Sequence, residues 1–397
     1  QVAMMHAEGR EDLRQLANVM LRLKGAGPMM CREILVPIPK EAGNPSIERL
    51  RPLKLQEVIR KAMMGIIMRR FSRVLINHGL LDKAQFAFLP GKDTSLPLLA
   101  LREIVDFCST YRIPFSVLAQ DIRHAYDTVE YTVGKEMPLR RLGAPEEFIE
   151  LILNIDRQRK TEVASGQGLS GDILGEEGWF HDEAGWGQGG EESPLGWDCF
   201  FDVLLGVVED IGGPPLTMVG KDGKTAKMVG MTYADDALWL CPGGAREETM
   251  QRRVDASNIF YKFMGLENEP KKDEYTEMVP DGEDARGRPR WARTEDQPGT
   301  VTAREGVSTV AGHEESTAGP PVNITRVEPT QAWRYLGKWE GMAWGTEEAQ
   351  KERIEKSARD ALEFMRYKRT STDGVKQVLN TVLCPRAVYP LTFMSIG

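Results

Sequence analysis

The chain has 397 residues, of which 41% are hydrophobic and 28% are charged, and Asp and Glu (59) outnumber Lys and Arg (51), for a formal net charge of −8. A chain of this length can bury a large core in two or three lobes, and its composition excludes a collagen-like, a wholly disordered or a small disulfide-bonded protein. No apolar run approaches the roughly 18–20 residues that span a bilayer, and no secretory leader opens the chain. We therefore expect an intracellular protein without a membrane partner.

The five cysteines are scattered, and no two of them form a C-x-x-C pair. This spacing argues against a zinc ribbon or a disulfide framework and favours reduced thiols. The chain begins with Gln1 rather than Met, which is consistent with a piece of a longer polypeptide.

The hydrophobic periodicity predicts a chain of mixed helices and strands without an internal repeat. In chain order we expect a helix within 1–27, a strand at 33–39, an amphipathic helix at 57–75, a strand at 115–121, a helix from 145, a helix from 193, two strands at 227–232 and 237–241 joined as a hairpin, a helix at 245–264, a strand at 334–339 and a helix at 347–367. Ser193 and Pro194 mark a helix start, because Ser caps helices and Pro suits the first turn.

Charge is distributed unevenly along the chain. Between Glu48 and Arg73 many basic residues stand against only two acidic ones. The stretch 276–330 has the opposite excess, is rich in Gly, Pro, Glu, Arg and Thr, and shows little periodicity. We expect it to be a flexible insertion.

The helix expected at 57–75 combines an apolar stripe with basic residues. The stripe consists of Ile59, Ala62, Met63, Ile66, Ile67, Phe71 and Val74. The basic residues that fall largely away from it are Arg60, Lys61, Arg69 and Arg73. One interpretation is a core helix with a solvated basic face, and the other is a surface for a nucleic-acid backbone.

Three carboxylates adjoin apolar strands. Asp235 and Asp236 join the two strands of the expected hairpin, and Asp121 ends the strand at 115–121. A solvated turn would explain the pair, but two adjacent carboxylates repel each other, and a cation would offset the repulsion. If the strands are neighbours, the three carboxylates converge and offer the oxygen ligands that Mg²⁺ prefers.

Seven short motifs resemble those of reverse transcriptases of the non-LTR, LINE-like retrotransposon family, in the same order. Residues 121–129 (DIRHAYDTV) resemble motif A, 188–195 (QGGEESPL) motif B, 233–236 (YADD) motif C and 335–337 (YLG) motif E. The resemblance extends to three finger motifs of that branch, at 38–40 (IPK), 51–53 (RPL) and 85–88 (QFAF). It also extends to the thumb helices of that branch, at 353–389.

The resemblance implies an α+β right-hand polymerase, in which an antiparallel palm sheet packs on helices. It implies fingers at 28–117, a palm at 115–340 and thumb-like helices at 341–397, after an N-terminal helical extension at 1–27. Residues 128–185 would belong partly to the fingers, and 276–330 would be an insertion in the palm.

The resemblance also implies the site. Asp121, Asp235 and Asp236 would be catalytic and would hold two Mg²⁺ ions, with Mn²⁺ as a substitute. Two such ions stabilise the attacking and the leaving oxygen of a phosphoryl transfer. The substrate would be a dNTP, bound by Lys40, Arg51, Tyr126, Gln188, Gly189 and Lys272. The nucleic-acid-binding residues would be Arg60, Lys61, Arg69 and Arg73.

Two of these roles have a physical basis. The ring of Tyr126 would leave no room for a 2′-hydroxyl group, which favours dNTPs over rNTPs, although a core aromatic is the commoner fate of such a residue. Lys40 and Arg51 would bind the triphosphate, because guanidinium groups match phosphate oxygens and an ammonium group supplies a point charge. Taken one at a time, basic residues like these are more often solvated surface charges.

The expected function is that of an RNA-directed DNA polymerase that extends a DNA primer on an RNA template, as in retrotransposition. The family resemblance also suggests an endonuclease domain elsewhere in the polypeptide and a nuclear location. A catalytically silent scaffold and an RNA-dependent RNA polymerase are the alternatives. The chain departs from the family pattern at Glu191 and Glu192, which add negative charge to motif B, and at motif D, where either Lys271 or Lys272 takes the lysine position.

Overall fold

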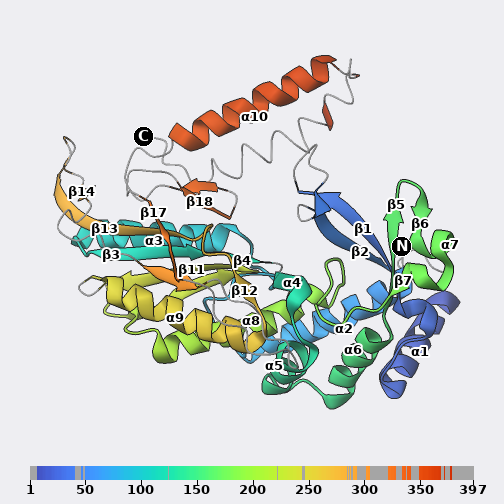
Figure 1. The fold of residues 1–397 in the computed structure, drawn as a ribbon. Helices are drawn as coiled ribbons and strands as arrows, with labels where there is room; N and C mark the ends of the chain where they lie inside the picture. Colours follow the sequence, from blue (N-terminus) through green and yellow to red (C-terminus); the bar gives the residue numbers. More distant parts are fainter. Residues whose placement is uncertain are drawn as a thin grey trace.

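The computed structural model describes most of the chain up to residue 283 and shorter stretches beyond it (Figure 1). The described residues are 7–40, 46–47, 50–123, 125–220, 222–243, 246–283, 285, 287, 289–292, 301–304, 321–327, 333–336, 338–340, 348–367, 371 and 376–377. They form a mixture of helices and β-sheets.

The helices and strands carry the labels of Figure 1. The helices and helical turns are α1 (Ala7–Leu23), η2 (Pro28–Cys31), α2 (Val58–Asn77), α3 (Ser95–Tyr111), α4 (Ala125–Thr128), the π-helical turn η4 (Thr132–Glu136), α5 (Met137–Arg141), α6 (Glu146–Gln158), α7 (Ser170–Leu174), η5 (Gly175–Gly178), α8 (Ser193–Ile211), α9 (Arg246–Met264) and α10 (Glu348–Tyr367). The strands are β1 (Arg32–Pro39), β2 (Leu50–Gln56), β3 (Phe115–Gln120), β4 (Ile122–Arg123), β5 (Lys160–Ser165), β6 (Gly168–Leu169), β7 (Trp179–Phe180), β8 (Leu216–Val219), β9 (Thr225–Met228), β10 (Gly230–Tyr233), β11 (Asp236–Pro242), β12 (Glu267–Asn268), β13 (Glu274–Glu283), β14 (Pro289–Ala292), β15 (Thr302–Arg304), β16 (Pro321–Asn323), β17 (Thr325–Arg326), β18 (Trp333–Tyr335) and β19 (Lys338–Glu340). The helices predicted within 1–27, at 57–75, from 145, from 193, at 245–264 and at 347–367 are confirmed as α1, α2, α6, α8, α9 and α10.

The central sheet has the order β10-β11-β3-β13-β14, with β17 paired to β13. The hairpin β10–β11 is confirmed, although the strand expected over 227–232 is divided between β9 and β10. β11 runs antiparallel to β3, with Ala237 opposite Gln120 and Trp239 opposite Leu118. The two strands that the sequence could not place relative to each other are therefore neighbours.

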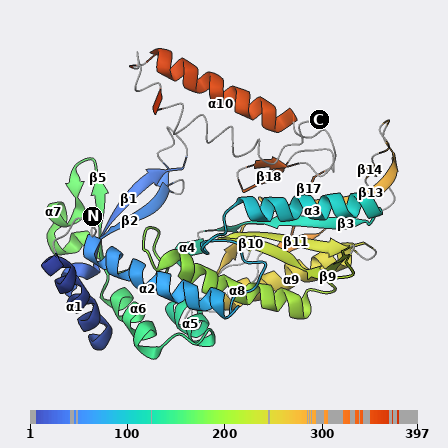
Figure 2. The same ribbon diagram turned by 180° about the vertical axis from the view of Figure 1, so that it is seen from behind.

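Helices cover both faces of the central sheet (Figure 2). On one face, Val117 and Leu238 pack in a cluster with the buried side of α3. On the other face, Leu118 and Trp239 pack in a larger cluster with α8 and α9. Successive side chains of a strand point to opposite faces, which explains why an almost continuous apolar run such as that of β3 is buried on both sides.

The segment expected to be a flexible insertion begins inside the central sheet, so its predicted start at 276 is wrong. Residues 274–278 of β13 pair antiparallel with β3, with Tyr275 opposite Leu118. The side chains of Tyr275 and Met278 are buried. The acidic residues of this segment argued against a buried strand. In the structure, however, Glu277 is itself buried and forms an ion pair with Arg326 of β17 (2.7 Å).

The N-terminal sheet is formed by β1, β2, β5, β6 and β7. β1 pairs antiparallel with β2 and parallel with β5, so residues 160–163 lie beside residues 32–35. In Figure 1 this sheet stands at one end of the molecule, above α1 and α6. It is separate from the central sheet, and α2 and α8 lie between the two in Figure 2.

The buried face of α2 differs from the predicted stripe. Arg60, Met64 and Met68 are buried, whereas Ile66 and Val74 of the expected stripe are exposed. Arg60 was expected to bind nucleic acid, and this prediction is wrong because the side chain is fully buried between Glu33 and Glu192. The ion pairs with the two carboxylates offset the cost of removing this guanidinium group from water, so the arginine can face the interior.

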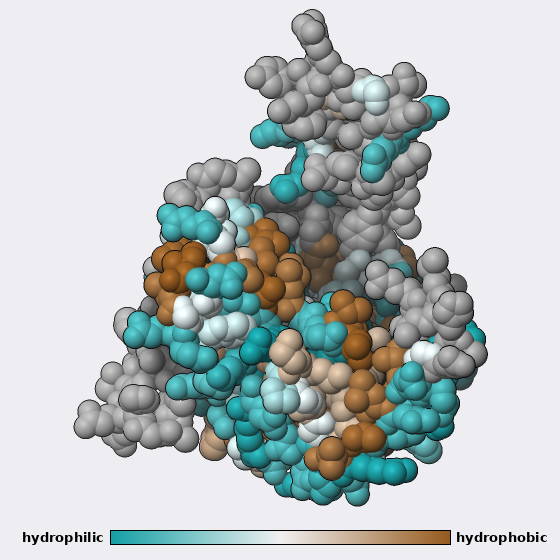
Figure 3. All heavy atoms as spheres, turned by 90° about the vertical axis from the view of Figure 1, so that its right-hand side faces the viewer, coloured by the Kyte–Doolittle hydropathy of each residue, from teal (hydrophilic) through white to brown (hydrophobic). Residues whose placement is uncertain are grey.

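Hydrophobic and hydrophilic side chains both lie on the end of the molecule that carries the N-terminal sheet. Figure 3 shows hydrophobic groups on the coloured part of this face, separated by hydrophilic ones. Leu23, Met29 and Leu174 are among the exposed apolar side chains of this part of the chain. Scattered apolar side chains are normal on protein surfaces and indicate no interface.

The C-terminal elements are only partly described. The strand predicted at 334–339 is the hairpin β18–β19, and α10 follows it. Of the predicted thumb at 341–397, residues 341–347 and most residues after 367 lie outside the described residues. None of the described helices combines the length and the apolar character that crossing a bilayer requires.

Candidate active site

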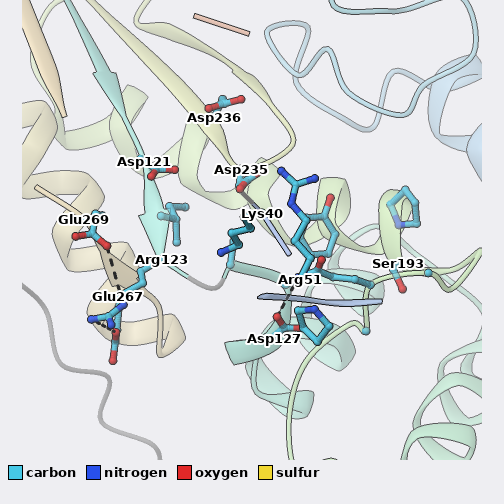
Figure 4. A pocket seen from close by; sticks show the side chains of 18 of the residues that line it. Lys40, Arg51, Asp121, Arg123, Asp127, Ser193, Asp235, Asp236, Glu267 and Glu269 are labelled. Carbon is cyan, nitrogen blue, oxygen red and sulfur yellow. Dashed lines mark hydrogen bonds and ion pairs between the residues drawn. The ribbon is translucent and has the colours of Figure 1, made fainter. Parts of the chain in front are cut away.

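A pocket of about 1320 Å³ lies where the central sheet, the N-terminal sheet and the start of α8 meet. Figure 4 shows the side chains that point into it. All nine residues predicted to bind metal or substrate line this pocket: Lys40, Arg51, Asp121, Tyr126, Gln188, Gly189, Asp235, Asp236 and Lys272. They come from seven different parts of the chain, so the fold brings together what the sequence keeps apart.

The pairing of β3 with β11 brings the carboxylates together. Asp121 directly follows β3, Asp235 lies in the turn after β10, and Asp236 begins β11. Burial raises the pKa of Asp235, the negative charge of Asp121 raises it further, and Arg51 and Lys272 oppose the change. Asp121 and Asp235 both line the pocket, and their negative charges interact.

The donor chemistry of this pair fits a hard divalent cation. Mg²⁺ is usually bound by one or two carboxylates together with waters and substrate phosphates. Asp121 and Asp235 can supply the carboxylates, and Asp236 lines the same pocket. Within the described residues, however, no group of three or more His, Cys, Asp or Glu side chains is arranged as a metal site. The expected set of three carboxylate ligands is therefore not assembled, whereas a two-carboxylate site is compatible with the geometry.

Asp121 also has a cationic partner. The Lys272 Nζ lies 2.9 Å from the Asp121 Oδ2, and Glu269 lies 3.9 Å from the same ammonium group. β12 pairs with β4 beside Asp121, which places the loop after β12 against the carboxylate. Lys271 lines the pocket as well, but the contact with Asp121 favours Lys272 as the lysine of this loop.

Asp273 is a site residue that the sequence did not predict. Its Oδ1 accepts a hydrogen bond from the backbone N–H of Asp121 at 3.0 Å, and its side chain is fully buried. Burial raises the pKa of Asp273 to about 8. The one signal in the sequence was an acid next to a strand, which is too common to mark a site.

The glycine-rich loop 185–190 crosses the N-terminal sheet. The Gln188 carbonyl oxygen accepts a hydrogen bond from the Lys54 backbone N–H at 2.7 Å. Its side-chain Nε2 donates to the Asp127 Oδ2 at 3.0 Å. Gly189 has φ +125°, and a Cβ there would lie 2.3 Å from the Lys54 carbonyl oxygen, so only glycine fits. The loop is thus held against β2 by its backbone.

Glu192, which departs from the family pattern, is not part of the pocket wall. It is buried, and its Oε1 lies 2.8 Å from Arg60 NH2. Arg60 NH1 in turn lies 2.9 Å from the Glu33 Oε1 of β1. The pairing with Arg60 keeps the pKa of Glu192 below its usual value despite the opposing effect of burial. Glu191 is exposed and lines the pocket.

Tyr126 of α4 lines the pocket. Its ring stacks on Trp197 of α8, with centroids 4.7 Å apart and an interplanar angle of 26°. Burial and the nearby charge of Asp235 raise the pKa of Tyr126, which keeps the phenol neutral. The position in the pocket that it shares with Asp235 is compatible with a contact to the sugar of a nucleotide.

The remaining basic residues fall into two groups. Lys40 and Arg51 are exposed and line the pocket, and Figure 4 shows both side chains. Arg69 and Arg73 are exposed and Lys61 is half-buried on α2, and none of the three lines the pocket.

Comparisons with known proteins give a weak likeness. No protein-family model and no curated protein sequence matches the chain. Among solved structures, the chain is similar to an apo telomerase from Candida tropicalis truncated from the C-terminal domain, with a TM-score of 0.45 and 10% sequence identity. The match covers 66% of this chain and 54% of that chain, so this chain spans about half the length of that structure. A likeness of this size assigns no reaction, and the function has to be argued from the pocket.

Proposed function

We propose that the chain is a nucleotidyltransferase of the polymerase kind, and more specifically an RNA-directed DNA polymerase. The observation that supports this proposal is the convergence of two strand-end carboxylates, Asp121 and Asp235, with Lys40, Arg51 and Lys272 in one pocket. The carboxylates can bind a metal ion, and the basic side chains can bind a triphosphate. Together they suit the transfer of a nucleotide to a primer hydroxyl group.

In this proposal Asp121 and Asp235 would hold Mg²⁺, with Mn²⁺ as a substitute, and Asp236 lines the same pocket without completing a set of three ligands among the described residues. When bound, the metal supplies Lewis-acid stabilisation of phosphoryl oxygens and favours an ionised primer hydroxyl group. The ion pair with Lys272 orients the Asp121 carboxylate.

Each remaining role follows from position and chemistry. Lys40 and Arg51 bind and orient the triphosphate in the pocket. Lys272 neutralises charge on the departing pyrophosphate or protonates it. Gln188 and Gly189, held by β2 and Asp127, contact the nucleotide and the template.

Tyr126 selects the sugar in this proposal. Its ring lines the pocket together with Asp235, and in this proposal it fills the space that the 2′-hydroxyl group of an rNTP would need. The motif order described above resembles non-LTR retrotransposon enzymes, which is the basis for proposing an RNA template, a DNA primer and a role in retrotransposition. An endonuclease domain elsewhere in the polypeptide and a nuclear location belong to the same proposal.

The deciding experiment is primer extension on RNA and on DNA templates, with dNTPs or with rNTPs, in Mg²⁺ and in Mn²⁺. We expect incorporation of dNTPs on RNA, lowered on the order of 100-fold or more by Asp235→Asn and by Asp121→Asn. Asp222→Asn is the matched control, because Asp222 is exposed and pairs only with neighbouring Lys224 among the described residues.

Two outcomes would contradict the proposal. A chain that binds primer–template but incorporates nothing, and binds no Mn²⁺ at Asp121 and Asp235, is a scaffold. A chain that prefers rNTPs, and gains nothing for rNTPs from Tyr126→Ala, is an RNA polymerase.

A further inference from the structure

Trp197 is a fully buried residue of α8 that lies directly beneath the candidate active site. Its indole stacks with two other rings: Tyr126, with centroids 4.7 Å apart and an interplanar angle of 26°, and Phe201, with centroids 5.2 Å apart and an angle of 28°. Phe200 contacts its edge at 5.4 Å. Tyr126 is therefore the outermost ring of a stack whose other members belong to the core.

The same indole holds the turn that carries Asp235. The Trp197 Nε1–H donates a hydrogen bond to the Ala234 carbonyl oxygen at 2.8 Å. Ala234 has φ +55°, a left-handed conformation that is uncommon for residues other than glycine. A buried indole can only donate, and leaving its N–H without a partner is costly. The hydrogen bond therefore stabilises the turn in the conformation in which Ala234 precedes Asp235.

One rigid side chain thus contacts two functional groups from different parts of the chain. Tyr126 belongs to α4 and Ala234 to the β10–β11 turn, and both line or adjoin the pocket, whereas Trp197 does not line it. The indole has few rotamers and also stacks with Phe201, so both contacts depend on how this one ring is seated.

We infer that Trp197 is a positioning residue that sets the Tyr126 ring relative to Asp235. The expected consequence, a change in sugar selectivity, rests on the proposed function. The gap between the Tyr126 ring and Asp235 is where the sugar of an incoming nucleotide would lie. A change in this gap alters the preference for dNTPs over rNTPs before it alters the chemistry of the carboxylates.

Trp197→Phe tests the inference, because phenylalanine keeps a ring in the stack but lacks the N–H donor. Amide hydrogen exchange of residues 232–237 reports on the turn without requiring activity. We expect exchange there to rise about tenfold, as the loss of one buried hydrogen bond predicts. The ratio of kcat/KM for a dNTP to that for the matching rNTP is expected to fall about fivefold to tenfold.

Two further variants separate positioning from general destabilisation. Phe148→Leu removes a buried ring from α6 that packs on Phe71 at 5.3 Å, away from the pocket. It is expected to lower thermal stability but to leave both the exchange of residues 232–237 and the nucleotide ratio unchanged. Phe201→Leu loosens the stack and leaves the indole donor in place, so it should change the ratio without changing the exchange. This variant also keeps the test decisive if Trp197→Phe does not fold.

The outcomes are distinct from those for the proposed function. If Trp197→Phe leaves both readouts at the wild-type values, or if Phe148→Leu changes them equally, Trp197 only fills space and the inference is wrong. If the wild-type chain incorporates no nucleotide, the polymerase proposal fails, and the hydrogen exchange alone decides whether Trp197 orders the Asp235 turn.

Discussion

At the scale of single residues, the contact between Lys272 and Asp121 makes the two neighbouring lysines unequal. The Lys272 ammonium group lies 2.9 Å from the Asp121 carboxylate, at the edge of the pocket. Lys272→Ala is expected to lower nucleotide incorporation by about tenfold to 100-fold, because a positioned cation or proton donor contributes this much to phosphoryl transfer. Lys271→Ala is the matched control and should have a smaller effect in single-nucleotide incorporation. A larger effect for Lys271 would assign the role to that residue instead.

Asp198 is a second residue whose environment predicts a measurable effect. It lies next to Trp197 on α8 and is fully buried, and among the described residues neither of its carboxylate oxygens has a hydrogen-bond partner. Burial raises the pKa of Asp198 well above its usual value, the nearby charge of Asp202 raises it further, and Lys92 opposes the change. The carboxyl group is therefore protonated in the folded chain at a pH where it is ionised in the unfolded chain.

The sign of the pH dependence follows from this difference. Above the unfolded pKa of about 3.9, the folded state binds one more proton than the unfolded state, so stability falls as the pH rises towards the folded pKa. The slope is at most about 1.4 kcal/mol per pH unit. Asp198→Asn should remove this contribution, so its free energy of unfolding should fall less steeply than that of the wild type between pH 5 and pH 8. Denaturant unfolding at several pH values measures this, and parallel curves for the two proteins would refute the assignment.

At the scale of elements, α2 separates structural from nucleic-acid roles within one helix. Arg60 is fully buried, with Glu33 and Glu192 as partners, and Arg73 is exposed. Arg60→Ala leaves the buried Glu192 without its ion-pair partner and leaves Glu33 with Arg159 alone (3.5 Å), and we expect it to lower the free energy of unfolding by about 3–5 kcal/mol. Urea denaturation is the measurement, with Arg73→Ala as the control on the same helix. Equal stability losses in the two variants would contradict the burial of Arg60.

Arg73→Ala is expected to weaken RNA binding rather than to lower stability. An exposed arginine that contacts a phosphate backbone contributes counterion release, so its loss should weaken RNA binding and reduce the salt dependence by about one ion. Its stability should change by less than about 0.5 kcal/mol. Fluorescence anisotropy of a labelled RNA over a range of salt concentrations tests this. Unchanged affinity and slope would remove α2 from the binding surface.

The same helix shows what the sequence can and cannot predict. The position and length of α2 follow from its apolar periodicity, but the stripe alone did not identify the buried face. Arg60 is buried because Glu33 and Glu192, far away in the sequence, surround it. Motif residues such as Asp121 and Asp235 were predicted to lie together and do. Asp273 and Trp197 were missed, because their contacts are with the backbone of Asp121 and Ala234, which no sequence pattern records.

At the scale of the whole molecule, two sheets that share no strand meet at the loop 185–190. The loop is attached to the N-terminal sheet by the backbone hydrogen bond from Lys54 to Gln188. The Lys54 side chain extends the attachment, since its Nζ lies 2.6 Å from Asp182 just before the loop. On the other side, Gln188 donates to Asp127, which follows the central sheet. The pocket therefore depends on how this one loop is seated between the sheets.

Gly189→Ala tests this dependence, because the substitution acts on the seating of the loop and removes no functional side chain. An added Cβ would lie 2.3 Å from the Lys54 carbonyl oxygen, in a conformation (φ +125°) that alanine avoids. The loop must move away from β2, and a displacement of about 1 Å at a reacting site costs on the order of 100-fold in rate. The matched control is Gly166→Ala, because Gly166 lies in the exposed turn between β5 and β6, where a Cβ meets nothing within 4 Å. We expect the rate of nucleotide incorporation to fall by about this factor in Gly189→Ala and to stay at the wild-type value in Gly166→Ala. Unfolding curves are recorded for both variants. If Gly189→Ala loses stability but keeps wild-type incorporation, the loop supports the fold without shaping the site, and the contacts of Gln188 have no part in nucleotide binding.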